Sequence, residues 1–150
     1  MTEARLLEFA DSLEKVMPEL MKRFLRSQVS ELYRGQITLP QFIVLNYLTH
    51  SGETKMKDLA GFMKVSTAAM TGIVERLVRD GYTRRLYEPK DRRIIKVDLT
   101  AKGQELLSKI RKQRRGLILR VFSKIPEKER EDYLRILKKI SEALKEEEPS

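Results

Sequence analysis

The 150-residue chain contains no cysteine and no tryptophan. Disulfides, thiolate-bound zinc and cysteine-based catalysis or redox sensing are therefore excluded. No apolar run reaches the roughly 18 residues that a membrane-spanning helix needs. The acidic, polar stretch over residues 1–10 lacks the basic-then-apolar order of a signal peptide. We therefore expect a cytoplasmic protein with no membrane partner.

Histidine is nearly absent, since His50 is the single one in the sequence. It falls at the predicted end of a helix, where a lone histidine is more often a capping or surface group than a catalytic base or metal ligand. No acidic pair, glycine-rich phosphate loop or metal-ligand cluster accompanies it. The sequence argues against an enzyme, and it predicts no cofactor and no metal site.

Charge is plentiful and unevenly distributed. Charged residues make up 35% of the chain, and the formal net charge is +9. Residues 55–124 contain 19 Lys and Arg against 7 Asp and Glu, whereas the remainder has 12 against 15. A basic middle indicates a polyanionic partner, with nucleic acid first and an anionic membrane surface second. A basic but merely solvated surface is the plain alternative.

Apolar residues recur at three- and four-residue steps in the first segment, which predicts a long amphipathic helix carrying Leu6, Leu7, Ala10, Leu13, Val16, Met17, Leu20, Met21 and Phe24. Pro18 is expected to kink or divide this helix, because proline lacks an amide donor. Gly35 is expected to close the segment. Thr38 and Gln41 have the spacing of a capping box for a helix over residues 39–50.

Two short helices follow, joined by a tight turn. Thr54 is predicted to cap a helix that continues through Phe62, and Ser66 to cap a second over residues 67–80. Gly81 is placed to stop the second helix. The small side chain of Ala60 permits close packing of the pair. This arrangement is typical of a helix-turn-helix, whose second helix enters the DNA major groove.

A helical wheel divides the second helix into an apolar and an outward side. The apolar side carries Met70, Ile73, Val74 and Leu77, and the outward side carries Ala68, Gly72, Glu75 and Arg79, flanked by Thr71 and Arg76. The outward residues of the first turns are small. We therefore expect specificity to depend on thymine methyl contacts, DNA shape and the following hairpin rather than on long side chains.

A β-hairpin is predicted next, from strand-like runs at residues 82–88 and 94–99. The intervening Pro89, Lys90, Asp91, Arg92 and Arg93 form a turn with three cations, in which Asp91 can orient an arginine. An arginine on a projecting ribbon suits a narrow minor groove. Two helices complete the chain, one capped by Thr100 and interrupted at Pro126, the other ending in an acidic tail.

From these residues a family resemblance follows. The segments KMKDLAGFMKVSTAAMTGIVERLVRDGY and EPKDRRIIKVDLTAKGQELL resemble the MarR family, with Asp91, Arg93, Leu99, Thr100 and Gly103 at family spacing. The resemblance implies a mainly α fold with a small two-stranded β-wing: a winged helix-turn-helix over residues 37–100, and a helical dimerisation region over 1–36 and 101–150. One departure is that Thr67 to Gly72 includes no Arg, Gln or Asn.

The resemblance implies a homodimer that binds double-stranded DNA at a pseudo-palindromic operator and represses transcription. The expected DNA-binding residues are Lys64, Ser66, Thr67, Ala68, Ala69, Thr71, Gly72, Arg76, Lys90, Asp91, Arg92 and Arg93. A small aromatic or anionic effector is the further partner that the resemblance suggests, with Met17, Phe24, Tyr33 and Phe42 as candidate lining. The basic run Arg111 to Arg115 is most simply a solvated helix face.

Three alternatives stay open on sequence alone. The basic wing can contact protein or RNA instead of duplex DNA, and binding to any duplex without operator preference would support that alternative. The terminal helices can fold back on one monomer instead of pairing with a second copy. An ordinary buried helix pair with an exposed outer face would also produce the helix-turn-helix pattern.

Overall fold

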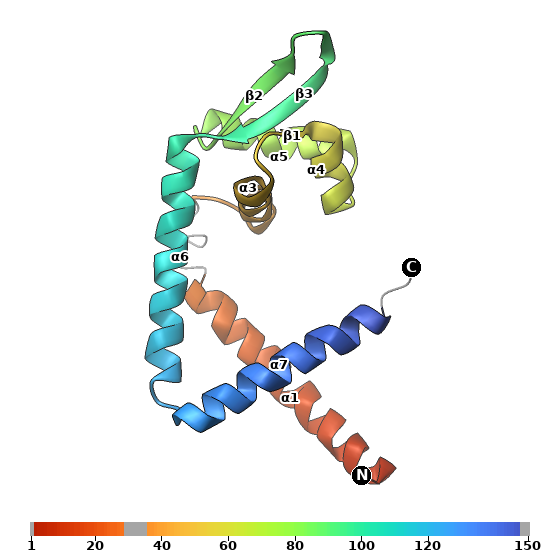
Figure 1. Ribbon diagram of the computed structural model, residues 1–150, viewed down its shortest axis with the longest axis vertical. Helices are drawn as coiled ribbons and strands as arrows, with labels where there is room; N and C mark the ends of the chain where they lie inside the picture. The colour runs from red at the N-terminus through yellow and green to blue at the C-terminus, as the bar shows by residue number, and fades with distance from the viewer. Residues whose placement is uncertain (1, 29–35, 148–150) are drawn as a thin grey trace. The chain divides into compact units, whose positions relative to one another are not determined.

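The computed structural model describes residues 2–28 and 36–147 (Figure 1). The chain divides into two compact units, residues 1–113 and 114–150. Its elements are α1 (Glu3–Gln28), α3 (Leu39–Ser51), β1 (Thr54–Lys55), α4 (Met56–Met63), α5 (Thr67–Arg79), β2 (Thr83–Glu88), β3 (Asp91–Leu99), α6 (Ala101–Phe122) and α7 (Glu127–Glu147). The mainly helical fold with a β-wing is confirmed.

The core of the first unit lies among α3, α4, α5, the sheet and the first half of α6. Its most deeply buried side chains are all apolar and at most 1% exposed: Val44, Leu45, Leu48, Leu59, Met70, Val74, Leu77 and Val97. Ala60 is also buried, so the close packing expected at this position of α4 is present. Burial of these side chains fixes the helix-turn-helix on the sheet.

Local capping signals predicted the helix boundaries well. The Thr38 hydroxyl accepts from the Gln41 amide at 3.4 Å, and the Thr38 amide donates to Gln41 Oε1 at 2.8 Å, which completes the predicted capping box. Helix α5 ends at Arg79, and Gly81 adopts a φ of +81°, the left-handed conformation that stops a helix.

The prediction for Thr54 was wrong. Thr54 and Lys55 form a short strand, β1, and α4 begins only at Met56 without a side-chain cap. The Thr54 hydroxyl donates to the carbonyl of Gly52 at 2.9 Å, and the residue that directly precedes α4 is Lys55. The backbone of Thr54 is opposite Val97 of β3, a pairing that a local pattern does not contain.

The wing therefore belongs to a three-stranded antiparallel sheet of order β1-β3-β2, not to a two-stranded one. Strand β3 starts at Asp91, three residues earlier than expected, and Asp91 is opposite Glu88 beside an irregularity at Tyr87 and Glu88. Only Pro89 and Lys90 separate the strands. Figure 1 shows the β2–β3 hairpin extending beyond α5, with its turn at the far end.

Helix α1 runs through Pro18 as one element, so the proline does not divide it. Gly35 lies outside the described residues. At the other end of the chain, α6 stops at Phe122, four residues before Pro126. In the second unit the rings of Phe122 and Tyr133 lie 5.6 Å apart, and Arg130 donates to the Phe122 carbonyl at 3.2 Å. No helix among residues 2–28 and 36–147 is long and apolar enough to cross a membrane.

Candidate nucleic-acid interface

The turn of the helix-turn-helix is formed by residues 64–66. Lys64 adopts a left-handed φ of 52°, and the amides of Lys64 and Val65 donate to the carbonyls of Gly61 and Ala60 at 3.2 and 3.1 Å. The Ser66 hydroxyl then accepts from the Ala69 amide at 3.1 Å and caps α5, as predicted. These bonds fix where α5 begins and how its first turn is presented.

Helix α5 has the two faces that the wheel predicted. Met70, Val74 and Leu77 are fully buried and Ile73 is half-buried. The opposite side exposes Thr67, Ala68, Ala69, Gly72, Glu75, Arg76 and Arg79. A Cβ built on Gly72 would meet nothing within 4 Å. The Thr71 hydroxyl is half-buried and donates to the Thr67 carbonyl at 2.8 Å, so its proton is engaged within the helix.

The wing tip holds its two arginines differently. The backbone amide, Nε and Nη2 of Arg93 donate to the Asp91 carboxylate at 3.0, 3.1 and 3.2 Å. These hydrogen bonds lower the pKa of Asp91. The arginine that Asp91 orients is thus Arg93. Arg92 and Lys90 are exposed and have no hydrogen-bond or ion-pair partner among the described residues.

Below the tip, cations of the hairpin are paired. Lys96 is 3.0 Å from Glu88, which raises the pKa of Lys96. Arg85 Nη2 on β2 is 3.5 Å from Glu75 Oε1 on α5, so an ion pair links the wing to the outward face of α5. The uncompensated charge of the hairpin is therefore concentrated at its tip.

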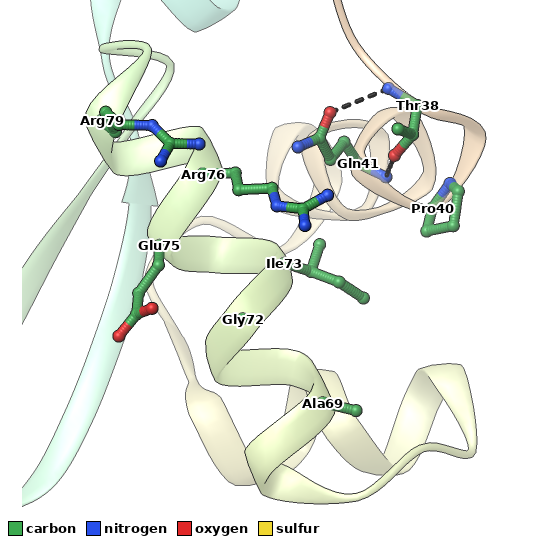
Figure 2. Close-up of a pocket in the computed structure, with 9 residues that line it drawn as sticks. All are labelled: Thr38, Pro40, Gln41, Ala69, Gly72, Ile73, Glu75, Arg76 and Arg79. Carbon is green, nitrogen blue, oxygen red and sulfur yellow. Dashed lines mark hydrogen bonds between the residues drawn. The ribbon is translucent and has the colours of Figure 1, made fainter.

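A groove of about 680 Å³ separates the start of α3 from the outward side of α5 (Figure 2). It is lined by Thr38, Pro40, Gln41, Ala69, Gly72, Ile73, Glu75, Arg76 and Arg79. Figure 2 shows the Arg76 side chain extending from α5 toward Gln41 on α3. The sequence placed Arg79 on the outward side of α5 but did not associate α3 with this surface. The capping box at Thr38 and Gln41 was the one sequence signal for this part of the groove, because it fixed where α3 starts.

The N-terminus of α3 contributes little to anion binding in this groove. Its capping box already uses the amides of Thr38 and Gln41, and Pro40 has no amide hydrogen. Arg76 and Arg79, both exposed, are the cationic groups of the groove. Phosphate contact here would depend on their guanidinium groups, which donate in a fork that matches phosphate oxygens.

The predicted effector residues are not brought together by this groove. Met17 is exposed on α1, Phe24 is half-buried, and Phe42 packs against the core of the first unit. Tyr33 lies outside the described residues. The effector site stays a prediction. His50 is exposed, with Nδ1 2.9 Å from the Asn46 carbonyl oxygen.

The MarR family model matches residues 37–95, which include the helix-turn-helix and most of the wing. The winged helix-turn-helix of this chain is therefore similar to that of the MarR family. "Uncharacterized HTH-type transcriptional regulator YpoP" of Bacillus subtilis is 24% identical over 102 residues, covering 68% of this chain and 72% of that protein. "HTH-type transcriptional repressor MdtR" of the same organism is 26% identical over 110 residues, covering 73% and 66%.

Solved structures agree on the fold. A MarR family protein from Bacillus stearothermophilus superimposes with a TM-score of 0.75 at 22% identity, covering 97% of this chain and 99% of that one. The chain thus has the winged helix-turn-helix fold of MarR family proteins, and its relatives are named as regulators of transcription.

Proposed function

We propose that this chain is a homodimeric repressor of the MarR family that binds a pseudo-palindromic DNA operator. The observation that carries the proposal is the exposed wing tip, where Lys90 and Arg92 are free and Arg93 is oriented by Asp91. A projecting hairpin with three cations suits the focused negative potential of a minor groove. The resemblance to MdtR, which is named a repressor, supports repression as the outcome.

In this proposal the first turns of α5 enter the major groove. The exposed small side chains from Thr67 to Gly72 let the helix approach the bases closely, and alanine and threonine methyl groups can contact thymine methyls. Lys64 and Ser66 lie at the turn before α5, where they can reach the DNA backbone. Arg76 and Arg79, both on the side of α5 that lines the groove, supply further phosphate contacts.

The dimer is proposed because α1 and α7 expose apolar side chains along their lengths. On α1 these are Leu6, Leu7, Phe9, Leu13, Val16, Met17, Leu20 and Met21, and on α7 they are Tyr133, Leu134, Ile136, Leu137, Ile140 and Leu144. Monomeric soluble proteins rarely leave such large apolar surfaces uncovered. A second copy related by a twofold axis covers both sets and also gives the operator its symmetry.

The test of this proposal is selection of bound sequences from a random duplex pool. The proposal predicts an inverted repeat whose half-sites are centred about 10 base pairs apart. Selection in parallel from a single-stranded RNA pool is the control for a wing that reads RNA. Enrichment of no motif in the duplex pool, or enrichment only in the RNA pool, would contradict the proposal.

The dimer has its own test. Leu13→Asp combined with Leu137→Asp places charges on both apolar surfaces, and sedimentation equilibrium should then report monomers where the wild-type chain forms dimers. The matched control is Lys15→Asp with Lys138→Asp, which introduces the same carboxylates at exposed charged positions of the two helices. A dimer that survives the leucine substitutions as well as the lysine ones would exclude these surfaces.

A further inference from the structure

Helix α5 is the recognition helix of the proposed function, and the three residues that follow it are hydrogen-bonded through their carbonyls to the start of α6. Lys102 Nζ donates to the Asp80 carbonyl at 2.7 Å, the Thr100 hydroxyl to the Gly81 carbonyl at 2.5 Å, and the Thr100 amide to the Tyr82 carbonyl at 3.1 Å. We call Thr100, Lys102 and Gly103 with these carbonyls the α5–α6 clip.

Two further features tighten the clip. The Lys102 ammonium lies 5.0 Å from the centre of the Tyr82 ring, and its aliphatic chain passes over Gly81. A cation at this place also interacts favourably with the negative end of the α5 dipole. The Thr100 hydroxyl at the same time accepts from the Gly103 amide at 3.2 Å, so one side chain both caps α6 and holds the end of α5.

Gly103 shows how close the approach is. A Cβ at this position would lie 2.2 Å from the Tyr82 carbonyl oxygen and 3.0 Å from Leu99 Cδ2. The first of these is a backbone atom, so it cannot move aside as a flexible side chain can. Gly103 therefore allows the first turn of α6 to lie directly against the backbone that follows α5.

We infer that the α5–α6 clip sets the orientation of the recognition helix relative to α6, making Thr100 and Lys102 positioning residues for operator spacing. Helix α6 continues without interruption to Phe122 and exposes Ile118, Leu119 and Val121 in its last turns. These exposed apolar residues extend the proposed dimer surface onto α6, so the clip determines how far apart the two recognition helices can lie. This inference rests on the proposed function.

The clip makes a prediction that a merely stabilising contact does not. One base pair inserted between two half-sites moves them apart by about 3.4 Å and rotates them by about 34°, given about 10.5 base pairs per turn. A dimer with rigidly held recognition helices should bind such an operator poorly. A dimer with a loosened clip should bind the lengthened operator with a smaller loss of affinity, even though the side chains that face the DNA are unchanged.

The experiment measures affinity for the selected operator and for the same operator with one base pair inserted. We expect the wild-type chain to lose about tenfold or more on insertion, a loss comparable to that of a mismatched base pair. The variant Thr100→Val with Lys102→Met should lose less than about threefold. Lys112→Met, an exposed lysine on the same helix, is the matched control and should keep the wild-type ratio. A clip variant with the wild-type ratio would overturn the inference.

Two further measurements keep the outcome decisive. If Thr100→Val lowers the folded fraction in thermal melts, Lys102→Met alone replaces the double variant, because Lys102 is exposed. The ratio of its affinity for the selected operator to its affinity for the lengthened operator should be smaller than the wild-type ratio. Amide hydrogen exchange without DNA should be faster over residues 78–84 in the clip variant, and unchanged exchange would also overturn the clip. A wild-type chain with no preferred duplex would instead contradict the proposed function.

Discussion

The substitution Arg92→Ala isolates the contribution of one of the two free cations at the wing tip, Lys90 and Arg92. Arg92 is exposed and has no partner among the described residues, so its removal should change the free energy of unfolding by no more than about 0.5 kcal/mol. A dimer loses two such cations. Each phosphate contact contributes about 0.9 to the slope of log K against log salt, so the slope should become about 1.8 units less steep.

The same slope gives the loss in affinity. We take the wild-type and variant affinities as equal at about 1 M salt, where the phosphate contacts contribute almost nothing. At about 0.15 M salt, a slope that is about 1.8 units less steep then makes the variant complex about 30-fold weaker, or about 2 kcal/mol. Fluorescence anisotropy with the selected operator over a salt series measures both quantities. Lys128→Ala on α7 removes the same charge and serves as the control, because it tests the effect of net charge alone. An unchanged slope for Arg92→Ala, or equal losses for the two variants, would refute the role of the wing.

Three further substitutions test the local structure. Gly103→Ala should lower the free energy of unfolding by about 2 kcal/mol or more in denaturant melts, because its Cβ would overlap the Tyr82 carbonyl; a loss under about 0.5 kcal/mol would contradict that contact. Ser66→Ala should cost about 1 kcal/mol through loss of the α5 cap, measured in the same way, and no loss would show the cap to be idle. Because Arg93 lowers the pKa of Asp91, their pairing is present at neutral pH and is lost as pH falls through that lowered pKa. Carbon-detected NMR should show the Asp91 titration midpoint rise toward its ordinary value in Arg93→Ala, and an unmoved midpoint would contradict the pairing.

Local signals in the sequence were sufficient for the start of α3 and for both ends of α5. The capping box at Thr38, the cap at Ser66 and the stop at Gly81 act over three or four residues, so their partners lie within the same short stretch of sequence. The two faces of α5 were predictable for the same reason, since helical periodicity alone decides which side chains share a face.

Contacts between distant segments were not predictable in this way. Thr54 is a good helix cap by its residue type, yet it is opposite Val97, and the strand pairing outweighs the local preference. The wing turn is shorter than expected because Asp91 joins β3 opposite Glu88. Both errors arise from strand partners that no pattern within a single segment specifies.

The candidate site likewise has features that the sequence predicted and features that only the structure shows. The sequence indicated that Asp91 orients an arginine, but only the structure distinguishes the paired Arg93 from the free Arg92. Gly103 was recognised through family spacing, whereas its physical reason is the position of the Tyr82 carbonyl. The groove beside Arg79 depends on where α3 packs against α5, and no local sequence pattern predicts that packing.

The most direct test of the central claim is the mass of the complex between the wild-type chain and its selected operator, measured by native mass spectrometry. A homodimer on an inverted repeat predicts two chains on one duplex, with no complex of one chain at saturation. A duplex that contains a single half-site should bind far more weakly. A saturated complex of one chain per duplex, or equal affinity for the half-site and the full operator, would contradict the account.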